Sequence, residues 1–540
     1  MKHVLVIGCG LSGLCCAVTL AQMGHSVTLA APYAPERSQS VLAAGGINAV
    51  EPSSAEGDTV ACHVDDTLRG GGYLASRAAV ERMCADAPEV LSWLEGLGVC
   101  FTRREDGGID RRAFGGHSHR RTAFAGTATG KQIMFSLIRY ARRLIGEGLI
   151  TYRLGMRFHS ALIAQGRCYG ALMLQDATGT LVPIYADATV MAVGGPNTLF
   201  GKTTGSTLCD GYAAGRLLMQ GVVLKDLEFI QYHPTAAETA DKHLLISEAV
   251  RGEGGRLYYL DGDRRVYFME ELYGPEGNRM PRDVVTRHIA QAGRTVYLDV
   301  SFLGAARIRE RLHETWELCR AYLGIDITQQ SLPVAPAVHF FMGGIAVDAS
   351  HRTSVDGLFA VGECASMYHG ANRLGANSLL SAIHGARVAA QAMDQDPRSF
   401  VPPDLTEVIR HARAAIETPT ANGCSAQAID RALAACLRTS LGIVRDKRTL
   451  AEGVSQVDAL LAQVRASGVR GTTVYESYRT QARLVLARAM LTCAQARRET
   501  RGAHVRADHP AAHEDAVSSL LTYDAGAYTV WYRKEDAICW

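Results

Sequence analysis

The sequence lacks any Cys-x-x-Cys pair, although it has 14 cysteines scattered over 540 residues. Iron–sulfur clusters need closely spaced cysteine ligands, so this absence argues against a cluster held by this chain. We interpret the cysteines as reduced thiols of a cytoplasmic protein, and we predict no metal site. Neither charge is in excess, because 56 basic residues face 54 acidic ones and the net charge is +2. That balance argues against electrostatic binding of nucleic acid.

Long apolar runs are also nearly absent. Only residues 4–23, after Met1-Lys2-His3, form such a run, and no other stretch reaches transmembrane length. A secretory signal peptide is one interpretation of this run. Its three glycines and the lack of a clear small-residue cleavage site favour the other interpretation, a folded strand and helix. With 47% hydrophobic and 20% charged residues, the chain can form a large core and shows no signature of disorder.

The N-terminal segment has the pattern of a dinucleotide-binding βαβ unit. A strand is expected at Val4–Ile7, a helix at Leu14–Met23 and a second strand at Val27–Ala30. Between the first strand and the helix, three glycines form a G-x-G-x-x-G turn, at Gly8, Gly10 and Gly13. They permit a tight turn, close approach to a pyrophosphate and close helix packing, and the helix N-terminus then faces the phosphates.

One position departs from this pattern. The second strand ends in Ala30-Ala31, where an acidic residue usually binds the ribose. Ribose contacts must therefore come from elsewhere in the chain. A nicotinamide dinucleotide consequently becomes a weaker candidate for a tightly bound ligand.

Glycine-rich segments recur beyond the N-terminal unit. Residues 38–50 are small and contain Gly45-Gly46, as expected where backbone passes close to a flat ring, although an ordinary turn has the same composition. Strands are expected within 184–196 and 355–366, and both run into glycines. Two further strands that end in glycine, so far from the N-terminal unit, predict that an insertion interrupts the nucleotide-binding fold.

The predicted fold class is α/β, with a Rossmann-like nucleotide-binding domain interrupted by an α+β capping domain and followed by a helical domain. The helical domain is expected because Ala, Leu, Arg and Glu dominate there and residues 476–498 have amphipathic spacing. The expected boundaries are 1–230 and 341–400 for the nucleotide-binding domain, 231–340 for the capping domain, 410–510 for the helical domain and 511–540 for an irregular C-terminal tail.

Four polar clusters, each surrounded by glycine or small residues, are the candidates for chemistry. They lie at residues 231–235, 247–255, 281–283, and 338–344 together with 369–378. Taken singly, each has an ordinary explanation, such as a capped histidine or a solvated ion pair. Taken together, they offer several arginines and histidines, and a dicarboxylate needs two separated cationic or donor sites. Such an excess of cations also stabilises a developing carbanion or enolate.

The sequence resembles the flavoprotein subunits of fumarate reductase and succinate dehydrogenase and the related L-aspartate oxidases. The resemblance is clear over residues 3–395 and looser over 437–510. Its most specific motifs are, in chain order, His233-Pro234-Thr235, Arg251-Gly252-Glu253-Gly254-Gly255, His369–Ser378 and, more loosely, Arg501-Gly502-Ala503-His504. It implies an FAD-dependent oxidoreductase that acts on CH–CH bonds.

The resemblance also implies a role for each candidate residue. The two substrate carboxylates would be bound by Arg373 with His339 and by His233 with Ser247. Arg282 would deliver a proton to fumarate as flavin N5 delivers a hydride, and Glu248 and Arg251 would relay protons to Arg282. A guanidinium is a very weak acid, so this role requires transient proton loss and reprotonation. The residues implied to contact FAD are Gly8, Gly10, Gly13, Ser38, Gln39, Ser40, Gly45, Gly46, Asp210, Glu363, Asn377, Ser378 and Leu379.

Two positions discriminate between members of the family. Aspartate oxidases typically have a glutamate where this chain has Phe114, and a phenyl ring offers nothing to a substrate ammonium. This favours fumarate or succinate as the substrate, although residues 116–121 also resemble the aspartate-oxidase loop. Many respiratory members attach FAD covalently through a histidine where this chain has Gln39, so FAD is expected to be non-covalent. Since the covalent bond raises the flavin potential, its absence favours the fumarate-reducing direction.

Partners follow from the same resemblance. Fumarate reduction needs an electron donor, and the chain has no cluster ligands, so an iron–sulfur or other redox partner protein is expected. We expect a cytoplasmic protein without a transmembrane segment, whose attachment to the inner face of the membrane would come through that partner. Two alternatives stay open: an L-aspartate oxidase that makes iminoaspartate for NAD biosynthesis, and a flavin-binding module that keeps the fold without turnover.

Overall fold

The computed structural model describes residues 1–51, 57–126, 128–398, 401–414, 422–470 and 474–540. A parallel sheet of five strands forms its centre, and segments far apart in the sequence share this sheet. In spatial order the strands are β19 (Leu358–Ala360), β10 (Ala188–Met191), β1 (His3–Ile7), β2 (Ser26–Ala31) and β6 (Ile150–Leu154). This arrangement confirms the interrupted Rossmann-like fold.

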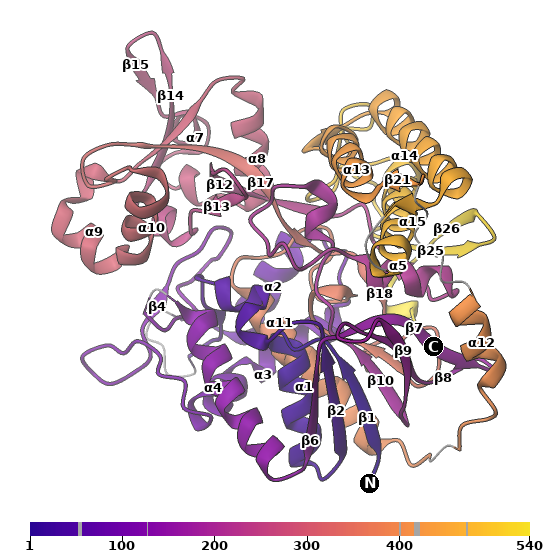
Figure 1. Ribbon diagram of the computed structural model, residues 1–540. Helices are drawn as coiled ribbons and strands as arrows, with labels where there is room; N and C mark the ends of the chain where they lie inside the picture. The colour runs from indigo at the N-terminus through magenta and orange to yellow at the C-terminus, as the bar shows by residue number, and fades with distance from the viewer. Residues whose placement is uncertain (52–56, 127, 399–400, 415–421, 471–473) are drawn as a thin grey trace.

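The apolar N-terminal run folds as β1 and helix α1 (Leu11–Gln22) in the interior of the protein. Helices α4 (Thr129–Gly146) and α11 (Asn377–Gln395) pack against α1, so it is covered on most sides (Figure 1). The adjacent Cys15 and Cys16 are therefore both fully buried. Two further helices, α2 (Val60–Gly70) and α3 (Arg77–Gly96), pack against each other, and α3 also packs against α11.

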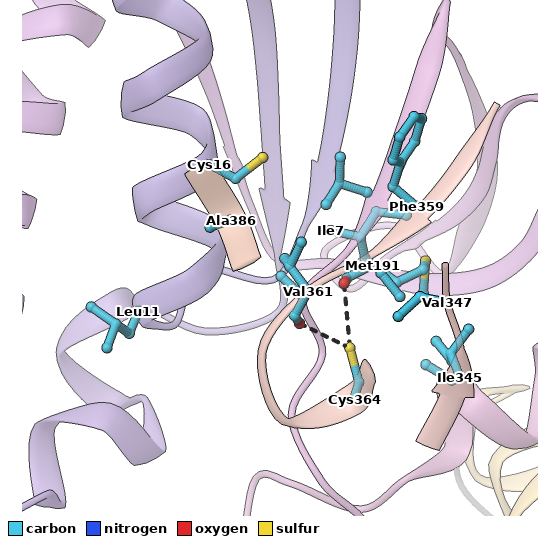
Figure 2. Close-up of a cluster of buried hydrophobic side chains, with 14 of the residues drawn as sticks. Ile7, Leu11, Cys16, Met191, Ile345, Val347, Phe359, Val361, Cys364 and Ala386 are labelled. Atoms are coloured by element: carbon cyan, nitrogen blue, oxygen red, sulfur yellow. Dashed lines mark hydrogen bonds between the residues drawn. The ribbon is translucent and has the colours of Figure 1, made fainter. Parts of the chain in front are cut away.

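Apolar side chains fill the space at the carboxyl ends of β1, β10 and β19. Figure 2 shows Ile7, Met191 and Phe359 from these strands, with Cys364 below Met191 and Val361. The Cys364 thiol donates to the backbone oxygens of Met191 and Val361, each at 3.3 Å. These contacts hold the short helical turn at Gly362–Cys364, which contains Glu363.

A smaller antiparallel sheet lies between β6 and β10 in the sequence. Its strands are β7 (Met156–Ala164), β8 (Arg167–Gln175) and β9 (Thr180–Tyr185). Helix α12 (Thr406–Ala414) packs against β7. A separate hydrophobic cluster, which includes Leu162, Tyr169 and Leu405, joins them.

The segment from Ile230 to Phe341, called the capping segment below, has its own antiparallel sheet and its own hydrophobic cluster. In Figure 1 the capping segment lies at the upper left, beyond the carboxyl ends of the parallel strands. The strands, in spatial order, are β13 (His243–Leu245), β12 (Ile230–Glu238), β17 (Leu332–Phe341), β16 (Val296–Asp299), β14 (Arg256–Asp261) and β15 (Arg264–Val266). The helices are α6 (Ala249–Gly252), α7 (Phe268–Tyr273), α8 (Arg282–Gln291), α9 (Ala305–Arg311) and α10 (His313–Leu323).

A helical region follows the second part of the parallel sheet. It consists of α13 (Ala426–Ser440), α14 (Lys447–Ser467) and α15 (Val474–Ala496), at the upper right of Figure 1. Helix α15 also packs against α5 (Tyr212–Met219) of the nucleotide-binding part. No helix in the described ranges has both the length and the apolar character needed to cross a bilayer.

The C-terminal residues are not the irregular tail that the sequence predicts. They form a hairpin of β25 (Ser518–Asp524) and β26 (Ala527–Arg533), joined by a two-residue turn in which Ala525 and Gly526 both have positive φ. The hairpin extends a sheet through β11 (Leu224–Lys225). The prediction was wrong because this pairing partner is two residues long and lies far away in the sequence, where no local pattern indicates a strand.

Candidate active site

A cavity of about 920 Å³ opens between the parallel sheet and the capping segment. Ligand cavities in proteins commonly measure about 300–1,000 Å³, so this volume suits a large ligand. All the predicted site residues line this cavity except Gly13, Asn377 and Arg251. Segments separated by hundreds of residues thus converge here.

The turn between β1 and α1 forms one end of the cavity. Gly8 has a φ of +110°, and a Cβ atom there would lie 2.2 Å from the Ala192 backbone oxygen. Gly13 stands behind this turn, and a Cβ atom there would lie 1.9 Å from the Gly8 oxygen. Only glycine fits either position, so the helix can begin directly beside the cavity. This is the geometry in which a helix N-terminus binds a phosphate.

The segment after β2 leaves polar atoms available at this end. The Leu11 N–H donates to Ser40 Oγ at 3.1 Å, whereas Gly10 gives the helix no side-chain cap. Ser38 Oγ and Gln39 Oε1 are buried and have no hydrogen-bond partner among the described residues. Buried polar atoms without partners are costly, so these two atoms fit a polar ligand such as a dinucleotide.

A second helix also begins at the cavity. Ala376, in a left-handed conformation with φ of 60°, precedes α11 and provides no side-chain cap, and Ser378 and Leu379 line the cavity. Asn377 itself points away, because it accepts a hydrogen bond from Asn48 at 2.7 Å and donates to Thr67 at 2.9 Å. Asn377 therefore fixes the start of the helix, and the helix presents its positive end to the cavity.

The glycine-rich segment at Gly45-Gly46 lines the cavity beside Phe114. Gly46 leads into β3 (Ile47–Asn48), and a Cβ atom there would lie 2.5 Å from the Ala123 oxygen of the neighbouring strand β5 (Thr122–Ala123). The glycine is thus needed for strand pairing as well as for an open cavity wall. Phe114 is buried and offers no charged group to a ligand.

Two acidic residues line the nucleotide side of the cavity. Asp210, just before α5, accepts hydrogen bonds from Arg479 Nε at 2.6 Å and from the Tyr475 hydroxyl at 3.0 Å, both on α15. Glu363 accepts one from the Phe341 N–H at 3.2 Å, and burial raises the pKa of its carboxyl to about 7. The helical region therefore holds part of the cavity wall in place.

A chain of three buried side chains lies at the capping end. Arg282, the first residue of α8, donates from Nε and Nη2 to Glu248 Oε2 at 2.8 and 2.6 Å. Arg251 donates from Nη2 to the other oxygen of Glu248 at 3.0 Å. Burial alone raises the pKa of Glu248, but the charges of Arg282 and Arg251 bring it below its ordinary value. Glu248 is thus a carboxylate held between two guanidinium groups.

Backbone encloses the Glu248 carboxylate on the remaining sides. A Cβ atom on Gly115 would lie 2.5 Å from Oε1, and one on Gly375 would lie 2.8 Å from Oε2. Side chains at either position would collide with the carboxylate. The two glycines therefore keep this ion chain closely packed.

Arg373 differs from Arg282 and Arg251, which both pair with Glu248. It is 4% exposed, it donates to Gln231 Oε1 at 3.1 Å, and it stacks over the Phe340 ring at 4.3 Å. It forms no salt bridge with any residue in the described ranges. Burial and the charge of Arg282 hold the pKa of Arg373 well below its usual value. A buried unpaired charge is strongly unfavourable, so a bound anion would stabilise this side chain.

Two histidines complete this end of the cavity. The rings of His233 and His339 lie 5.0 Å apart, edge to face. His339 Nδ1 is 2.8 Å from Thr204 Oγ1 and His233 Nδ1 is 3.0 Å from the Thr235 oxygen, which leaves Nε2 of each ring for a ligand. Burial, with the Arg282 charge, holds the pKa of both histidines well below the ordinary value, so both rings are neutral donors or acceptors.

The charges at this end favour a dianion. Arg251, Arg282 and Arg373 supply three positive charges and Glu248 supplies one negative charge, which leaves an excess of two positive charges. The Ser247 hydroxyl, which lines the cavity, adds a further hydrogen-bonding group. A small dicarboxylate matches both the charge and the donors.

Two residues of this end were not among the predicted site residues. The Gln231 oxygen accepts from Arg282 Nη1 at 2.9 Å and from Arg373, so it holds both guanidinium groups in one place. The position of Gln231 in the polar cluster 231–235 could have identified it as a site residue from the sequence. Thr204, which orients His339, lies in a loop with no motif, and the sequence contains no signal for it.

Comparisons with known proteins match almost the whole chain. The FAD binding domain family matches residues 3–379, and the fumarate reductase flavoprotein C-terminal family matches residues 430–537. The succinate dehydrogenase flavoprotein subunit of Bacillus subtilis is 35% identical, over 95% of this chain and 92% of that protein. The fumarate reductase flavoprotein subunit of Escherichia coli is 32% identical, over 95% and 90%.

Solved structures lead to the same family. A variant of E. coli quinol fumarate reductase has a TM-score of 0.90 at 30% identity, over 100% of this chain and 98% of that chain. The family match shows that the cofactor is FAD. The chain belongs to the family of fumarate reductase and succinate dehydrogenase flavoprotein subunits, and it is an FAD-dependent oxidoreductase of that type.

Proposed function

We propose that this protein interconverts fumarate and succinate and works in the fumarate-reducing direction. The observation that supports this most directly is Arg373, a buried guanidinium without an ionic partner, beside Arg282 and two neutral histidines. Relatives of both kinds, fumarate reductases and succinate dehydrogenases, match almost the whole chain. The reaction is thus supported by the family, and the direction is our inference from Gln39.

The substrate would bind with its two carboxylates at opposite ends of this cluster. Arg373 and His339 would hold one carboxylate, and His233 and Ser247 would hold the other. Arg373 can bind a carboxylate with two parallel hydrogen bonds. Its present contact with the Gln231 oxygen does not take the place of these two bonds. Phe114 would pack on the uncharged carbons between the carboxylates.

Arg282 would supply the proton for the reduced carbon. When bound, reduced FAD supplies a hydride from N5 to one alkene carbon, and Arg282 protonates the other. Arg251 would pass a proton to the Glu248 carboxylate as Glu248 passes one to Arg282, and Arg251 would be reprotonated from water. The hydrogen bonds of 2.6–3.0 Å along this chain are short enough for such transfers.

We further propose that FAD is bound without a covalent bond. Gln39 lines the cavity where many respiratory relatives have the attaching histidine, and an amide cannot form that bond. The missing bond leaves the flavin potential lower, which favours fumarate reduction over succinate oxidation. Denaturing gel electrophoresis should therefore show no flavin fluorescence on the polypeptide.

Electrons would come from another protein. The relatives are named as subunits, and this chain has no spaced cysteine ligands of its own. We propose an iron–sulfur or other redox partner, and we expect any association with the cytoplasmic face of a membrane to occur through it.

The test is fumarate reduction by purified protein with a reduced dye as the donor. Arg282→Ala should abolish fumarate reduction and leave FAD bound, because Arg282 lies at the substrate end of the cavity. Arg287→Ala, on the same helix and outside the cavity lining, is the matched control and should keep full activity. Substantial activity in Arg282→Ala would show that another residue is the acid.

The second candidate, an L-aspartate oxidase, differs at the substrate ammonium. Phe114 is buried and lines the cavity, so that position has no carboxylate for an ammonium. Mixing the oxidised protein with L-aspartate should leave the flavin absorbance unchanged. Bleaching by L-aspartate would assign the oxidase activity instead.

A further inference from the structure

The motif Arg501-Gly502-Ala503-His504 forms a tight turn close to the active site, called the 501–504 turn below. The Arg501 N–H donates to the His504 oxygen at 2.9 Å, and the His504 N–H donates to the Arg501 oxygen at 3.0 Å. Gly502, inside the turn, has a φ of +52°. None of these four described residues lines the large cavity. Any influence of the turn on the reaction must therefore pass through its neighbours.

The 501–504 turn packs directly against the segment that carries Arg373. The Ala503 N–H donates to the Ala371 oxygen at 3.0 Å, and Ala371 lies two residues before Arg373. A Cβ atom on Gly502 would lie 2.7 Å from the same oxygen. Ala371 is fully buried, so its oxygen cannot move aside into solvent. The position of this oxygen is therefore set by the turn.

The segment that follows α2 joins the same packing. The Ala371 N–H donates to the Gly71 oxygen at 2.8 Å, and Arg501 Nη1 donates to the Gly72 oxygen at 2.7 Å. A Cβ atom on Gly71 would lie 2.8 Å from the His369 oxygen. Three segments that are far apart in the sequence thus meet through backbone atoms. Backbone atoms in contact cannot adjust as flexible side chains can, so a shift in one segment is passed to the next.

Arg373 itself is held by Gln231 and Phe340. Gln231 Nε2 donates to the Arg373 backbone oxygen at 2.7 Å, and Gln231 Oε1 accepts from the guanidinium at 3.1 Å. The guanidinium stacks over the Phe340 ring at 4.3 Å. Phe340 and Ala371 belong to one small hydrophobic cluster, and Ala503 packs against that cluster. The turn therefore supports both the backbone near Arg373 and the group of side chains that contains the ring under its guanidinium.

We propose that the 501–504 turn positions Arg373 for the substrate, and that Gly502 is the residue on which this depends. The inference rests on the proposed function, because it requires Arg373 to bind a substrate carboxylate. Two parallel hydrogen bonds need the guanidinium in one place, and a misplacement of about 1 Å can cost about a hundred-fold in rate. The C-terminal region thus takes part in substrate binding without contacting the substrate.

The experiment displaces the Ala371 oxygen and leaves every side chain of the active site unchanged. Gly502→Ala adds a Cβ atom that collides with this oxygen. Gly262→Ala is the matched control, because Gly262 has a similar φ of +61° and its added Cβ atom would have no described atom within 4 Å. The two variants share the strain of an alanine at positive φ, so the collision is what distinguishes them.

Gly502→Ala should bind fumarate about ten-fold more weakly than Gly262→Ala, and it should reduce fumarate about ten-fold more slowly at low fumarate. Binding to the oxidised holoenzyme is measured from the change in flavin absorbance, and reduction is measured with a reduced dye. Reoxidation of the reduced flavin by ferricyanide needs no dicarboxylate site and should be equal in the two variants. The amount of bound FAD should also be equal.

A double-mutant cycle distinguishes positioning of Arg373 from a general structural effect. Adding Gly502→Ala to Arg373→Met should cause no further loss of fumarate binding, because the turn acts through Arg373. If Gly502→Ala does not fold, Arg501→Lys replaces it in all the measurements. Lysine keeps the charge beside Glu499, but one ammonium cannot reproduce the fork with which Arg501 reaches the Gly72 and His513 oxygens.

The outcomes separate the role of the turn from the proposed function. Equal fumarate binding by Gly502→Ala and Gly262→Ala would overturn the role of the turn, and so would an undiminished further loss in the Arg373→Met background. A parallel loss of the ferricyanide rate would also overturn it, because the damage would then lie at the flavin. A wild-type protein that binds fumarate without reducing it would remove the proposed function, and the binding measurements would still decide the role of the turn. A wild-type protein that does not bind fumarate would overturn both.

Discussion

Two buried clusters of arginine and glutamate in this protein differ in how completely their charges are paired. In the active site, Arg373 has no carboxylate partner, and Glu248 is shared by two arginines. In the C-terminal region, Arg497 is bound by Glu228 and by Glu499 and also donates to the Val517 oxygen. The first cluster borders a cavity, and the second is enclosed by packed elements.

The C-terminal cluster joins segments that are distant in sequence. Arg501 bonds Glu499 and also donates to the Gly72 oxygen at 2.7 Å, and Ser519 of the hairpin donates to Glu228 at 2.8 Å. Every side-chain nitrogen of Arg497 and Arg501 has an acceptor, so these two arginines act as a structural connection. The active-site cluster leaves positive charge without a partner, as a site for an anion must. The same residue types thus serve opposite purposes, and the pairing distinguishes them.

The largest expected effect comes from the unpaired arginine. Arg373→Met should lower the rate of fumarate reduction at low fumarate about a thousand-fold, since a desolvated charge pair with the substrate contributes roughly 2–5 kcal/mol. Its thermal midpoint should stay the same or rise, because methionine removes a buried charge that lacks a partner. Steady-state kinetics and thermal melting check both halves. A strongly destabilised Arg373→Met would mean that the guanidinium has a structural partner.

The paired cluster should respond in the opposite way. Arg497→Met leaves Glu228 and Glu499 buried with fewer partners, which typically costs about 3–5 kcal/mol. We expect a clearly lower thermal midpoint and normal fumarate reduction per folded molecule at low temperature. Arg488→Met, on helix α15, which ends just before Arg497, is paired with Asp458 near the surface; it is the control and should change little. An inactive but equally stable Arg497→Met would erase the distinction between the clusters.

A third arginine tests the boundary between the two kinds of cluster. Arg479 is paired with both Asp210 and Asp430, yet Asp210 lines the large cavity. Arg479→Met should weaken FAD binding about ten-fold, because Asp210 loses one of the two side chains that donate hydrogen bonds to it. Titration of the apoprotein with FAD measures this directly. An unchanged dissociation constant would show that Asp210 needs only Tyr475 for its position.

The N-terminal unit was predictable because its signals are local. The strand β1 and helix α1 follow from an apolar run broken by three glycines, and each glycine has a short-range steric reason. The convergence of Arg282 and Arg373 was expected only from the family resemblance. Nothing in the spacing of two residues so far apart indicates that one glutamine oxygen accepts hydrogen bonds from both.

Other features depend on contacts that no local pattern contains. The hairpin at the C-terminus pairs with β11, a strand of two residues. No local pattern indicates that strand, so an irregular tail was expected. A smaller cavity, of about 390 Å³, lies beside Arg251, where separate turns of the capping segment leave a space. The pairing of buried charges, which is the property that separates the two clusters, is set by tertiary packing and is not visible in sequence periodicity.

The smallest expected effect concerns a neutral histidine in the C-terminal cluster. Arg445 Nη1 lies 2.8 Å from His504 Nδ1. The arginine donates this hydrogen bond, so Nδ1 accepts it and carries no proton. Burial, with the charges of Arg445 and Arg497, holds the pKa of His504 well below its ordinary value of 6.5. Between that lowered pKa and 6.5, only the unfolded chain binds the proton. His504 therefore lowers the stability of the folded protein as pH falls below 6.5.

The size of this effect is about 1.4 kcal/mol per pH unit for one such group. His233 and His339 in the active site, with pKa values that are also well below 6.5, act in the same direction. Glu363 and Asp226 act in the opposite direction, because the pKa of each is raised to about 7. The thermal midpoint of the wild type should fall as the pH is lowered from 7.5 to 5.5. That of His504→Asn should fall less steeply. The asparagine amide can still accept a hydrogen bond from Arg445. Equal slopes would show that His504 is protonated in the folded protein, and the C-terminal cluster would then contain an unsatisfied charge of its own.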